Sequence, residues 1–129
     1  MNDQQIEQEI VQKGKTAPRV TPSHVESIIT SETYFTAADG RSGANIRIES
    51  EGGEKVNQVQ ELDDFNQLEL LTFCVLVLEN GFTVTGESAC ASPENFDAEI
   101  GRKIARQNAV NKIWLLEGYL LKQKLYDEQ

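Results

Sequence analysis

LLTFCVLVLENGFTVTGESACASPENFD, residues 70–97, is the stretch of sequence that decides the fold. Residues 70–78 are apolar at nearly every position, which is typical of a strand buried on both faces. Asn80-Gly81 then fits a tight hairpin turn, because Asn-Gly accepts a positive φ. Residues 82–86 alternate between apolar and polar side chains, as a strand exposed on one face does. The stretch therefore predicts two antiparallel strands and a polar loop that leads into a helix.

A long C-terminal helix is expected after this loop. Ser92-Pro93 is a helix-start signal, and Asn95 or Asp97 offers a second N-cap. Apolar residues then recur at helical spacing, namely Phe96, Ile100, Ile104, Ile113, Leu116 and Leu120. Residues 113–121 are apolar around most of the helix circumference, which exceeds what one small sheet covers. We therefore expect a helix–helix contact between subunits, in a homodimer or a larger homo-oligomer.

The N-terminal half predicts a tail, a short helix and a strand. Residues 1–19 read as a flexible tail, with a short docking helix as the alternative. Thr21-Pro22 supplies an N-cap and a first-turn proline, and Val25, Ile28 and Ile29 follow at helical spacing. Residues 32–36 contain β-branched and aromatic side chains and predict a strand that ends at Asp39-Gly40. Residues 20–129 are thus expected to form a single domain.

Residues 40–66 give the weakest structural signals. Residues 45–49 alternate with period two, which suits a strand exposed on one face. Residues 51–54 read as a turn, and residues 56–65 as a loop or an edge strand. The fold class that we predict is α+β: a small antiparallel sheet with a short N-terminal helix and a long C-terminal helix, assembled as an oligomer.

Composition restricts the possible partners and compartments. The net charge of −9 disfavours non-specific nucleic-acid binding, because each neutralised phosphate needs a Lys or Arg. The charge is uneven, since acids crowd residues 49–69 whereas residues 101–112 are basic with no acid. No apolar run reaches the length of a membrane span, and the first residues lack the pattern of a signal peptide. We therefore expect a protein of the host-cell cytoplasm, with no membrane partner.

Residues typical of catalysis or metal binding are better explained by structural roles. Carboxylates near residues 87–99 complement a helix dipole or cap exposed amides. His24 is the single histidine, so with Cys74 and Cys90 it cannot complete a metal quartet. The chain has neither a nucleophile elbow, a Cys-x-x-Cys pair nor a nucleotide-binding glycine loop. We expect no enzyme activity, no metal and no cofactor.

Arg102 and Arg106 are the strongest candidates for ligand contacts. Their i, i+4 spacing places them on one side of the helix, and guanidinium matches phosphate geometry bidentately. Ser88 and Asn95 in the preceding loop are candidates for the same phosphate, and Phe82 for stacking on a base. The alternative is that the arginines pair with Glu99, Glu94 or the acidic middle region. The residues alone favour this second interpretation.

Several segments resemble one family of small accessory proteins of tailed phages and prophages, whose members carry phage gene numbers. The resemblance covers most of residues 21–125. The matching segments are residues 71–78, 80–90, 93–105 and 112–114, together with 21–26 and 34–40 in the N-terminal half. The resemblance implies a phage origin and states no activity.

The order of the elements is also similar to the first class of Thoeris anti-defence proteins. Those proteins bind and hold cyclic ADP-ribose-type immune signals, and some also bind cyclic oligonucleotides, in pockets built across subunit contacts with aromatic and arginine residues. The resemblance implies a non-catalytic protein that sequesters a nucleotide-derived signal, with Phe82, Asn95, Arg102 and Arg106 in the corresponding roles. The rival hypothesis is an acidic protein–protein inhibitor or nucleic-acid mimic that acts through residues 49–69.

Overall fold

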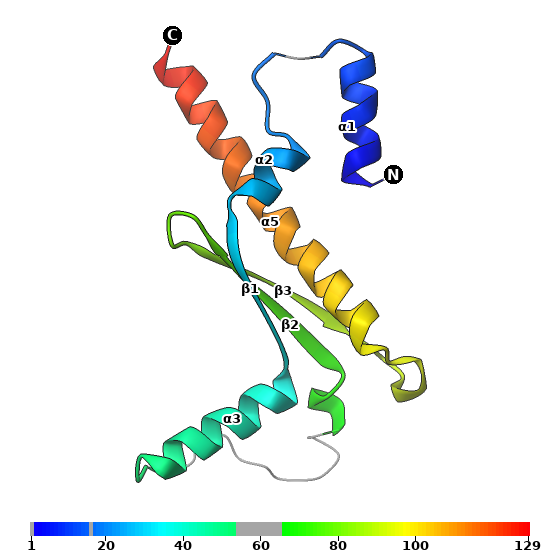
Figure 1. Cartoon of the computed structure of the whole chain (residues 1–129), viewed down its shortest axis with the longest axis vertical. Helices are drawn as coiled ribbons and strands as arrows, with labels where there is room; N and C mark the ends of the chain where they lie inside the picture. Colours follow the sequence, from blue (N-terminus) through cyan, green and yellow to red (C-terminus); the bar gives the residue numbers. More distant parts are fainter. Residues whose placement is uncertain (1, 16, 54–65) are drawn as a thin grey trace.

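The computed structural model describes residues 2–15, 17–53 and 66–129 and contains a three-stranded antiparallel sheet with helices around it. The elements are α1 (Asp3–Gln12), α2 (Pro22–Ser27), β1 (Ile29–Thr36), α3 (Ala37–Ser50), β2 (Leu71–Leu78), β3 (Thr83–Ala89), the 3₁₀ helix η1 (Pro93–Asn95) and α5 (Ala98–Asp127). The strand order is β1-β2-β3, and the long helix α5 crosses one face of the sheet (Figure 1). The predicted α+β class is confirmed, whereas the oligomeric state stays a prediction.

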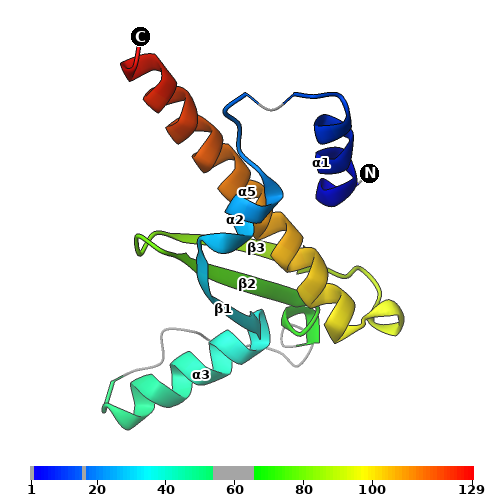
Figure 2. The same ribbon diagram turned by 45° about the horizontal axis from the view of Figure 1, so that its top comes forward.

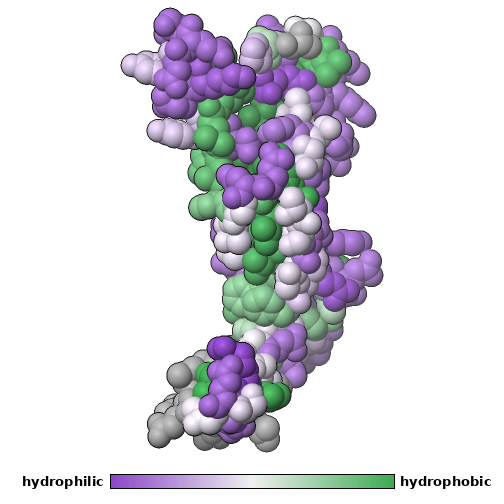
Figure 3. Space-filling view, turned by 60° about the vertical axis from the view of Figure 1, so that its left-hand side comes forward, coloured by the Kyte–Doolittle hydropathy of each residue, from purple (hydrophilic) through white to green (hydrophobic). Residues whose placement is uncertain are grey.

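Strands β2 and β3 form the hairpin that the sequence predicts. Gly81 has φ +88°, and the Leu78 amide donates to the Phe82 carbonyl at 2.8 Å. Thr72, Cys74, Leu76 and Leu78 point toward α5 and are buried, while the alternate side chains of β2 are half-buried. Burial on both faces was expected, so the prediction holds for one face. Figure 3 shows a lengthwise band of apolar surface on one side of the molecule.

Helix α5 lies against the sheet at very close range. Asp97 is its N-cap, with Oδ1 accepting from the Ile100 amide at 3.0 Å, which settles the choice between Asn95 and Asp97. A Cβ added to Gly86 on β3 would stand 2.2 Å from the Ala105 carbonyl oxygen of α5. Glycine at this position therefore allows strand and helix backbones to meet. The core is the set of side chains between them, with Leu76 and Ile113 fully buried.

The N-terminal elements agree with the sequence in part. Thr21 caps α2, Pro22 occupies its first turn, and Val25 and Ile28 are buried in the core. Ile29 already belongs to β1, so the predicted helix ends earlier. The structure makes residues 3–12 a helix, α1, which is the docking-helix alternative for that segment. Figures 1 and 2 place α1 beside α5.

Two sequence-based boundaries need correction. Residues 45–49 are not a strand but part of α3, which follows β1 directly and replaces the expected strand end at Asp39-Gly40. A reciprocal capping box starts this helix: the Asp39 amide donates to Thr36 Oγ1 at 3.1 Å, and the Thr36 amide donates to Asp39 Oδ2 at 3.0 Å. The expected loop or edge strand at residues 56–65 lies outside the described residues.

The C-terminal half of α5 extends past the sheet alongside α2 (Figure 2). Leu115 and Tyr119 in this half are 78% and 72% exposed, and Leu120 and Tyr126 are exposed as well. Leu115, Tyr119 and Tyr126 are spaced four and seven residues apart in turn, so they share one side of the helix. This apolar stripe is consistent with the expectation that one sheet does not cover the whole helix.

Candidate functional site

Arg102 lies at a small pocket where the sheet meets the first turns of two helices. The pocket has a volume of about 140 Å³. Its lining is Tyr34, Phe35, Thr36, Asp39, Thr72, Phe96, Ala98 and Arg102, from the ends of β1 and β2, the start of α3 and the start of α5. Sequence analysis singled out Arg102 alone among these residues.

The topology explains why these elements converge. Thr36 at the end of β1 pairs with Thr72 at the start of β2, and α3 begins directly after Thr36. The first turns of α5 pack onto the same end of the sheet: a Cβ added to Gly101 would lie 3.1 Å from Thr72 Oγ1. Arg102 is the next residue along α5, and its position is therefore restricted by the close approach of Gly101 to the Thr72 side chain.

The Arg102 side chain is exposed and has no hydrogen bond or ion pair within the described part of the chain. Asp39, the carboxylate that shares the pocket, accepts a hydrogen bond from the Thr36 amide and so serves the capping box of α3. Tyr34 and Phe96 supply aromatic surface beside the guanidinium. The pocket thus combines a cation without a protein partner among the described residues, the aromatic rings of Tyr34, Phe35 and Phe96, and small polar groups.

Arg106, one turn further along α5, has a different environment. Its Nη2 donates to Glu26 Oε2 at 2.6 Å, its Nε donates to Glu32 Oε1 at 2.8 Å, and its side chain is 29% exposed. The Tyr34 hydroxyl donates to the other Glu32 oxygen at 3.0 Å. We call Arg106, Glu26, Glu32 and Tyr34 the Arg106 cluster. The predicted ion pairing of an arginine is therefore observed, but with Glu26 of α2 and Glu32 of β1 in place of Glu94 or Glu99.

The Arg106 cluster also shifts the acidity of its members. Hydrogen bonds from Arg106 hold the pKa values of Glu26 and Glu32 below their ordinary value of 4.5, because they favour the charged carboxylates. Burial, and then the bond to Glu32, raises the pKa of the Tyr34 hydroxyl. At neutral pH, Arg106 consequently stays bound between two charged carboxylates. A phosphate would have to displace them.

The remaining predicted site residues are divided between the two ends of the sheet. Ser88 pairs with Thr72 across β2 and β3, so it adjoins the Arg102 pocket. Asn95 lies exposed in η1, just before Phe96 of the pocket wall. Phe82 follows the hairpin turn at the far end of β3, about 20 Å from Ser88 at the usual rise per residue. Phe82, 56% exposed, is thus too distant to stack on a base held by Arg102 of the same chain.

The histidine and the cysteines lie away from this pocket. His24 Nε2 is 3.3 Å from Glu117 Oε2, on the projecting half of α5. Cys74 is in the core, where burial raises the pKa of its thiol, and the Cys90 thiol donates to the Ser92 carbonyl at 3.1 Å. Across the described ranges, no three His, Cys, Asp or Glu side chains form a group suited to a metal ion.

Sequence reasoning missed most of the pocket wall. Tyr34, Thr36, Asp39 and Phe96 come from three segments that only the strand register and helix docking bring together. A local signal existed for one pair: Thr36-x-x-Asp39 is a capping pattern, which places both residues at a helix start.

No helix in the described part of the chain has both the length and the apolar character to cross a bilayer.

Comparisons with known proteins show one family match. Neither the curated proteins nor the solved structures include a significant match to the chain. The model of one protein family, described as "Phage protein (N4 Gp49/phage Sf6 gene 66) family", matches residues 20–125, from just before α2 almost to the end of α5. The chain therefore belongs to this phage protein family.

Proposed function

We propose that this protein binds and sequesters a small nucleotide-derived immune signal, of the cyclic ADP-ribose or cyclic oligonucleotide class, in the cytoplasm of the infected bacterium. The observation that carries the proposal is Arg102, an exposed guanidinium with no partner among the described residues, at the mouth of a pocket with aromatic walls. Membership of a phage protein family supports the bacterial setting.

Arg102 suits the phosphate of such a signal. A guanidinium offers two parallel N–H donors to two phosphate oxygens, and the contact is charge-assisted. Thr36 and Thr72 bring hydroxyls to the same pocket, and Tyr34 and Phe96 bring rings. Sequestration requires that the protein bind the ligand but not that it react with it. The proposed function therefore needs no nucleophile or general base beside Arg102.

The small size of the pocket is compatible with one chain holding part of the ligand. Sites for complete small ligands usually measure about 300–1,000 Å³, whereas this pocket measures about 140 Å³. The space is appropriate for a phosphate group and part of a sugar. We infer that a second copy of the chain completes the site, and Phe82 of that copy is a candidate for stacking on the base because it is too distant in the same chain.

The projecting half of α5 supports association of two copies. Leu115, Tyr119 and Tyr126 form an exposed apolar stripe, and pairing two such helices would remove the stripes from water. In this proposal the stripe holds the homodimer together, the Arg102 pocket binds phosphate, and the Arg106 cluster keeps α5 in register with α2 and β1.

Ligand binding is the direct test. Calorimetric titration of the purified protein with cyclic ADP-ribose isomers and with cyclic dinucleotides should give saturable binding to at least one class. Arg102→Ala should lose about tenfold or more of that affinity, because it removes a charge-assisted contact. Lys103→Ala is the matched control: Lys103 is the neighbouring cation, already paired with Glu99 at 3.3 Å, and its replacement should leave affinity unchanged.

The fate of the ligand separates sequestration from its rivals. Heat denaturation of the complex should release the nucleotide unaltered, as judged by mass spectrometry; an altered nucleotide would show catalysis and overturn the proposal. Equal losses of nucleotide affinity in the Arg102 and Lys103 variants would show that the ligand does not bind at the Arg102 pocket. Absence of binding by every nucleotide, with loss of anti-defence activity on neutralising Asp63 and Asp64, would favour the acidic inhibitor.

Association is tested on the same footing. Tyr119→Glu places a charge in the apolar stripe without touching the Arg102 pocket. Sedimentation should change from dimer to monomer, and nucleotide affinity should fall although Arg102 is intact. A monomeric wild-type protein that binds the nucleotide fully would show that a single chain is sufficient.

A further inference from the structure

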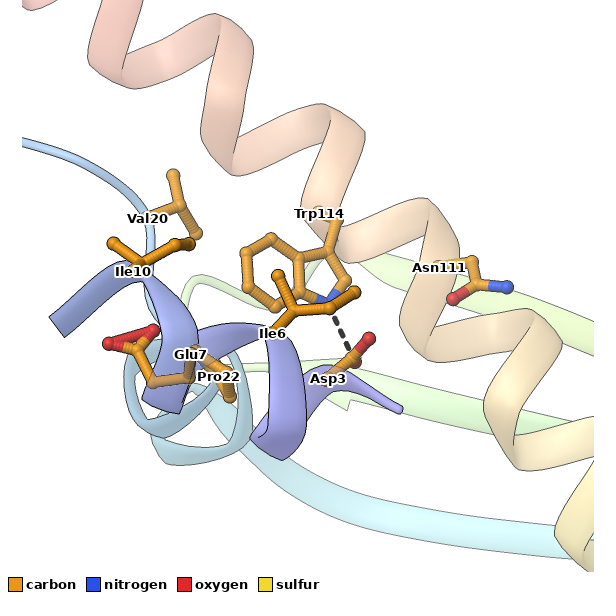
Figure 4. Close-up of a pocket in the computed structure, with 8 residues that line it drawn as sticks. All are labelled: Asp3, Ile6, Glu7, Ile10, Val20, Pro22, Asn111 and Trp114. Atoms are coloured by element: carbon orange, nitrogen blue, oxygen red, sulfur yellow. Dashed lines mark hydrogen bonds between the residues drawn. The ribbon is translucent and has the colours of Figure 1, made fainter. Parts of the chain in front are cut away.

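A second cavity lies between α1 and α5, further toward the C-terminus of α5 than the Arg102 pocket. Figure 4 shows the Trp114 ring extending from α5 toward Ile6 of α1, with Val20 and Ile10 beyond it and Asp3 at one end. Its volume is about 430 Å³, within the range of small-molecule sites of about 300–1,000 Å³. Ile6, Ile10, Val20, Pro22 and Trp114 give it mostly apolar walls.

Polar contacts join α1 to α5 and to the segment before α2, and a cavity remains beside them. No residue of α1 is buried, and Ile6 is 44% exposed although it faces the cavity. Asp3 Oδ2 accepts a hydrogen bond from Trp114 Nε1 at 3.2 Å, and Glu7 accepts two from Arg19. Both contacts are made by the first half of α1, whose inward side chains line one wall of the cavity.

The charges around the cavity favour a cation. Arg19 compensates Glu7, whereas the indole N–H that bonds Asp3 is neutral, so the charge of Asp3 has no cationic partner in the described ranges. An adjoining cavity of about 230 Å³, on the other side of Asp3 and Trp114, adds Glu26, which Arg106 compensates. The lining of neither cavity includes a Lys or Arg. An anion would therefore meet Asp3 without a compensating charge.

We propose that this cavity binds a flat, apolar organic cation, with its ring system against Trp114 and its ammonium group at Asp3. A flat aromatic body can stack on the face of the indole ring and fill the space between Trp114, Ile6 and Val20, while its ammonium group reaches Asp3. One Asp3 oxygen already accepts the indole N–H, and the carboxylate retains capacity for an ammonium donor. The charge that the site offers to a ligand is opposite to that of the Arg102 pocket, and the inference does not depend on the proposed function.

Two probes of the same shape and opposite charge test the proposal. Calorimetric titration with 1-naphthylmethylammonium should give saturable binding to the full chain, and 1-naphthaleneacetate should bind at least about tenfold more weakly. Asp3→Asn keeps an oxygen that accepts the indole N–H but removes the charge, so it should remove most of the difference between the probes. Equal affinity of both probes for the wild type, or no binding of either, would overturn the proposal.

A cavity-filling variant locates the binding. Ile10→Phe adds volume inside the cavity and should abolish binding of the ammonium probe. Ile46→Ala, at an exposed position of α3 outside both proposed sites, should leave that binding unchanged. Circular dichroism and the emission of Trp114, the single tryptophan of the chain, check that each variant is folded. Full binding by the Ile10→Phe protein would place the ammonium elsewhere and refute the site.

Discussion

The Arg102 pocket and the Arg106 cluster lie one turn apart on the same helix and use the same residue type in opposite ways. Arg106 is enclosed by Glu26 and Glu32 and joins α2, β1 and α5. Arg102 faces a pocket and has no partner in the part of the chain that the structure describes. The i, i+4 spacing is identical in kind, so the difference comes from which distant elements the fold places opposite each arginine.

The comparison shows how a helix divides its charges between structure and function. A guanidinium held by two carboxylates gives up most of its capacity to bind a ligand, since each of the three Arg106 nitrogens already donates to a carboxylate oxygen. An arginine without partners contributes little to folding, and its donors are available to a ligand such as the phosphate proposed above. Arg102 is therefore the residue on which a ligand-binding proposal can rest, and Arg106 is the residue on which the position of α5 depends.

The largest expected effect comes from Gly86, because both arginines depend on α5 lying directly on β3. Gly86→Ala would place a Cβ 2.2 Å from the Ala105 carbonyl oxygen and 2.3 Å from the Ala109 amide nitrogen, so the helix must move. We expect a loss of about 3 kcal/mol or more in the free energy of unfolding. Urea denaturation followed by circular dichroism measures it.

Gly118→Ala is the matched control on α5. An added Cβ there meets nothing within 4 Å, and alanine is the better helix former. This variant should gain about 0.5–1 kcal/mol. Similar losses from both glycine replacements would show that the close approach of α5 and β3 is not what the fold requires.

The second expected effect separates the two arginines directly. Arg106→Ala leaves Glu26 and Glu32 facing each other without their cation and should destabilise the protein by about 1–2 kcal/mol. The figure is below that of a buried pair, because water screens carboxylates that are about a third to a half exposed. Arg102→Ala should change stability by less than about 0.5 kcal/mol. Equal effects in urea denaturation would contradict the division of roles.

The third expected effect concerns the helix start that positions Arg102. Asp97→Ala removes the side chain that accepts from the Ile100 amide and should cost about 1 kcal/mol. Asn95→Ala, in η1, should be near neutral, since no N-cap hydrogen bond of α5 involves its side chain. A larger loss of stability in the Asn95 variant than in the Asp97 variant would show that Asp97 is not the N-cap of α5. Thermal unfolding of the two variants side by side is sufficient to decide.

Local signals predicted those elements whose residues specify them without outside help. The hairpin at Asn80-Gly81 and the Thr21 cap of α2 each depend on a few neighbouring residues. For α5 the sequence left Asn95 and Asp97 as alternative caps, and the structure selects Asp97. Residues 45–49 misled because Ile46 and Ile48 alternate as in a strand, although the capping box at Thr36 and Asp39 starts a helix that continues through them. The start of this helix is therefore set at Thr36, well before the misleading pattern begins at Asn45.

The candidate site was predictable only in its local part. The sequence predicted Arg102 as a ligand contact because it is a cation near a helix start. No pattern near Arg102 in the sequence predicts that Tyr34 and Thr72 line the same pocket. Likewise, Glu26 and Glu32 reach Arg106 across 80 and 74 residues, through the packing of α2 and β1 on α5. Phe82 looked close to the loop in sequence, yet the length of β3 separates them.

The smallest expected effect is a pH dependence that belongs to the Arg106 cluster and not to the Arg102 pocket. The pKa values of Glu26 and Glu32 are lowered in the folded protein by their bonds to Arg106, so the unfolded chain binds protons more readily than the folded one. Their stabilising contribution is complete above the ordinary carboxyl pKa of 4.5 and is lost as the pH falls below it toward the lowered values. Urea midpoints measured from pH 7 down to pH 3 should therefore fall less steeply for Arg106→Ala than for the wild type.

The Arg102→Ala protein should follow the wild-type curve, because no carboxylate among the described residues is paired with Arg102. A flattened curve for this variant would mean that Arg102 has a carboxylate partner in solution and is not free to bind phosphate.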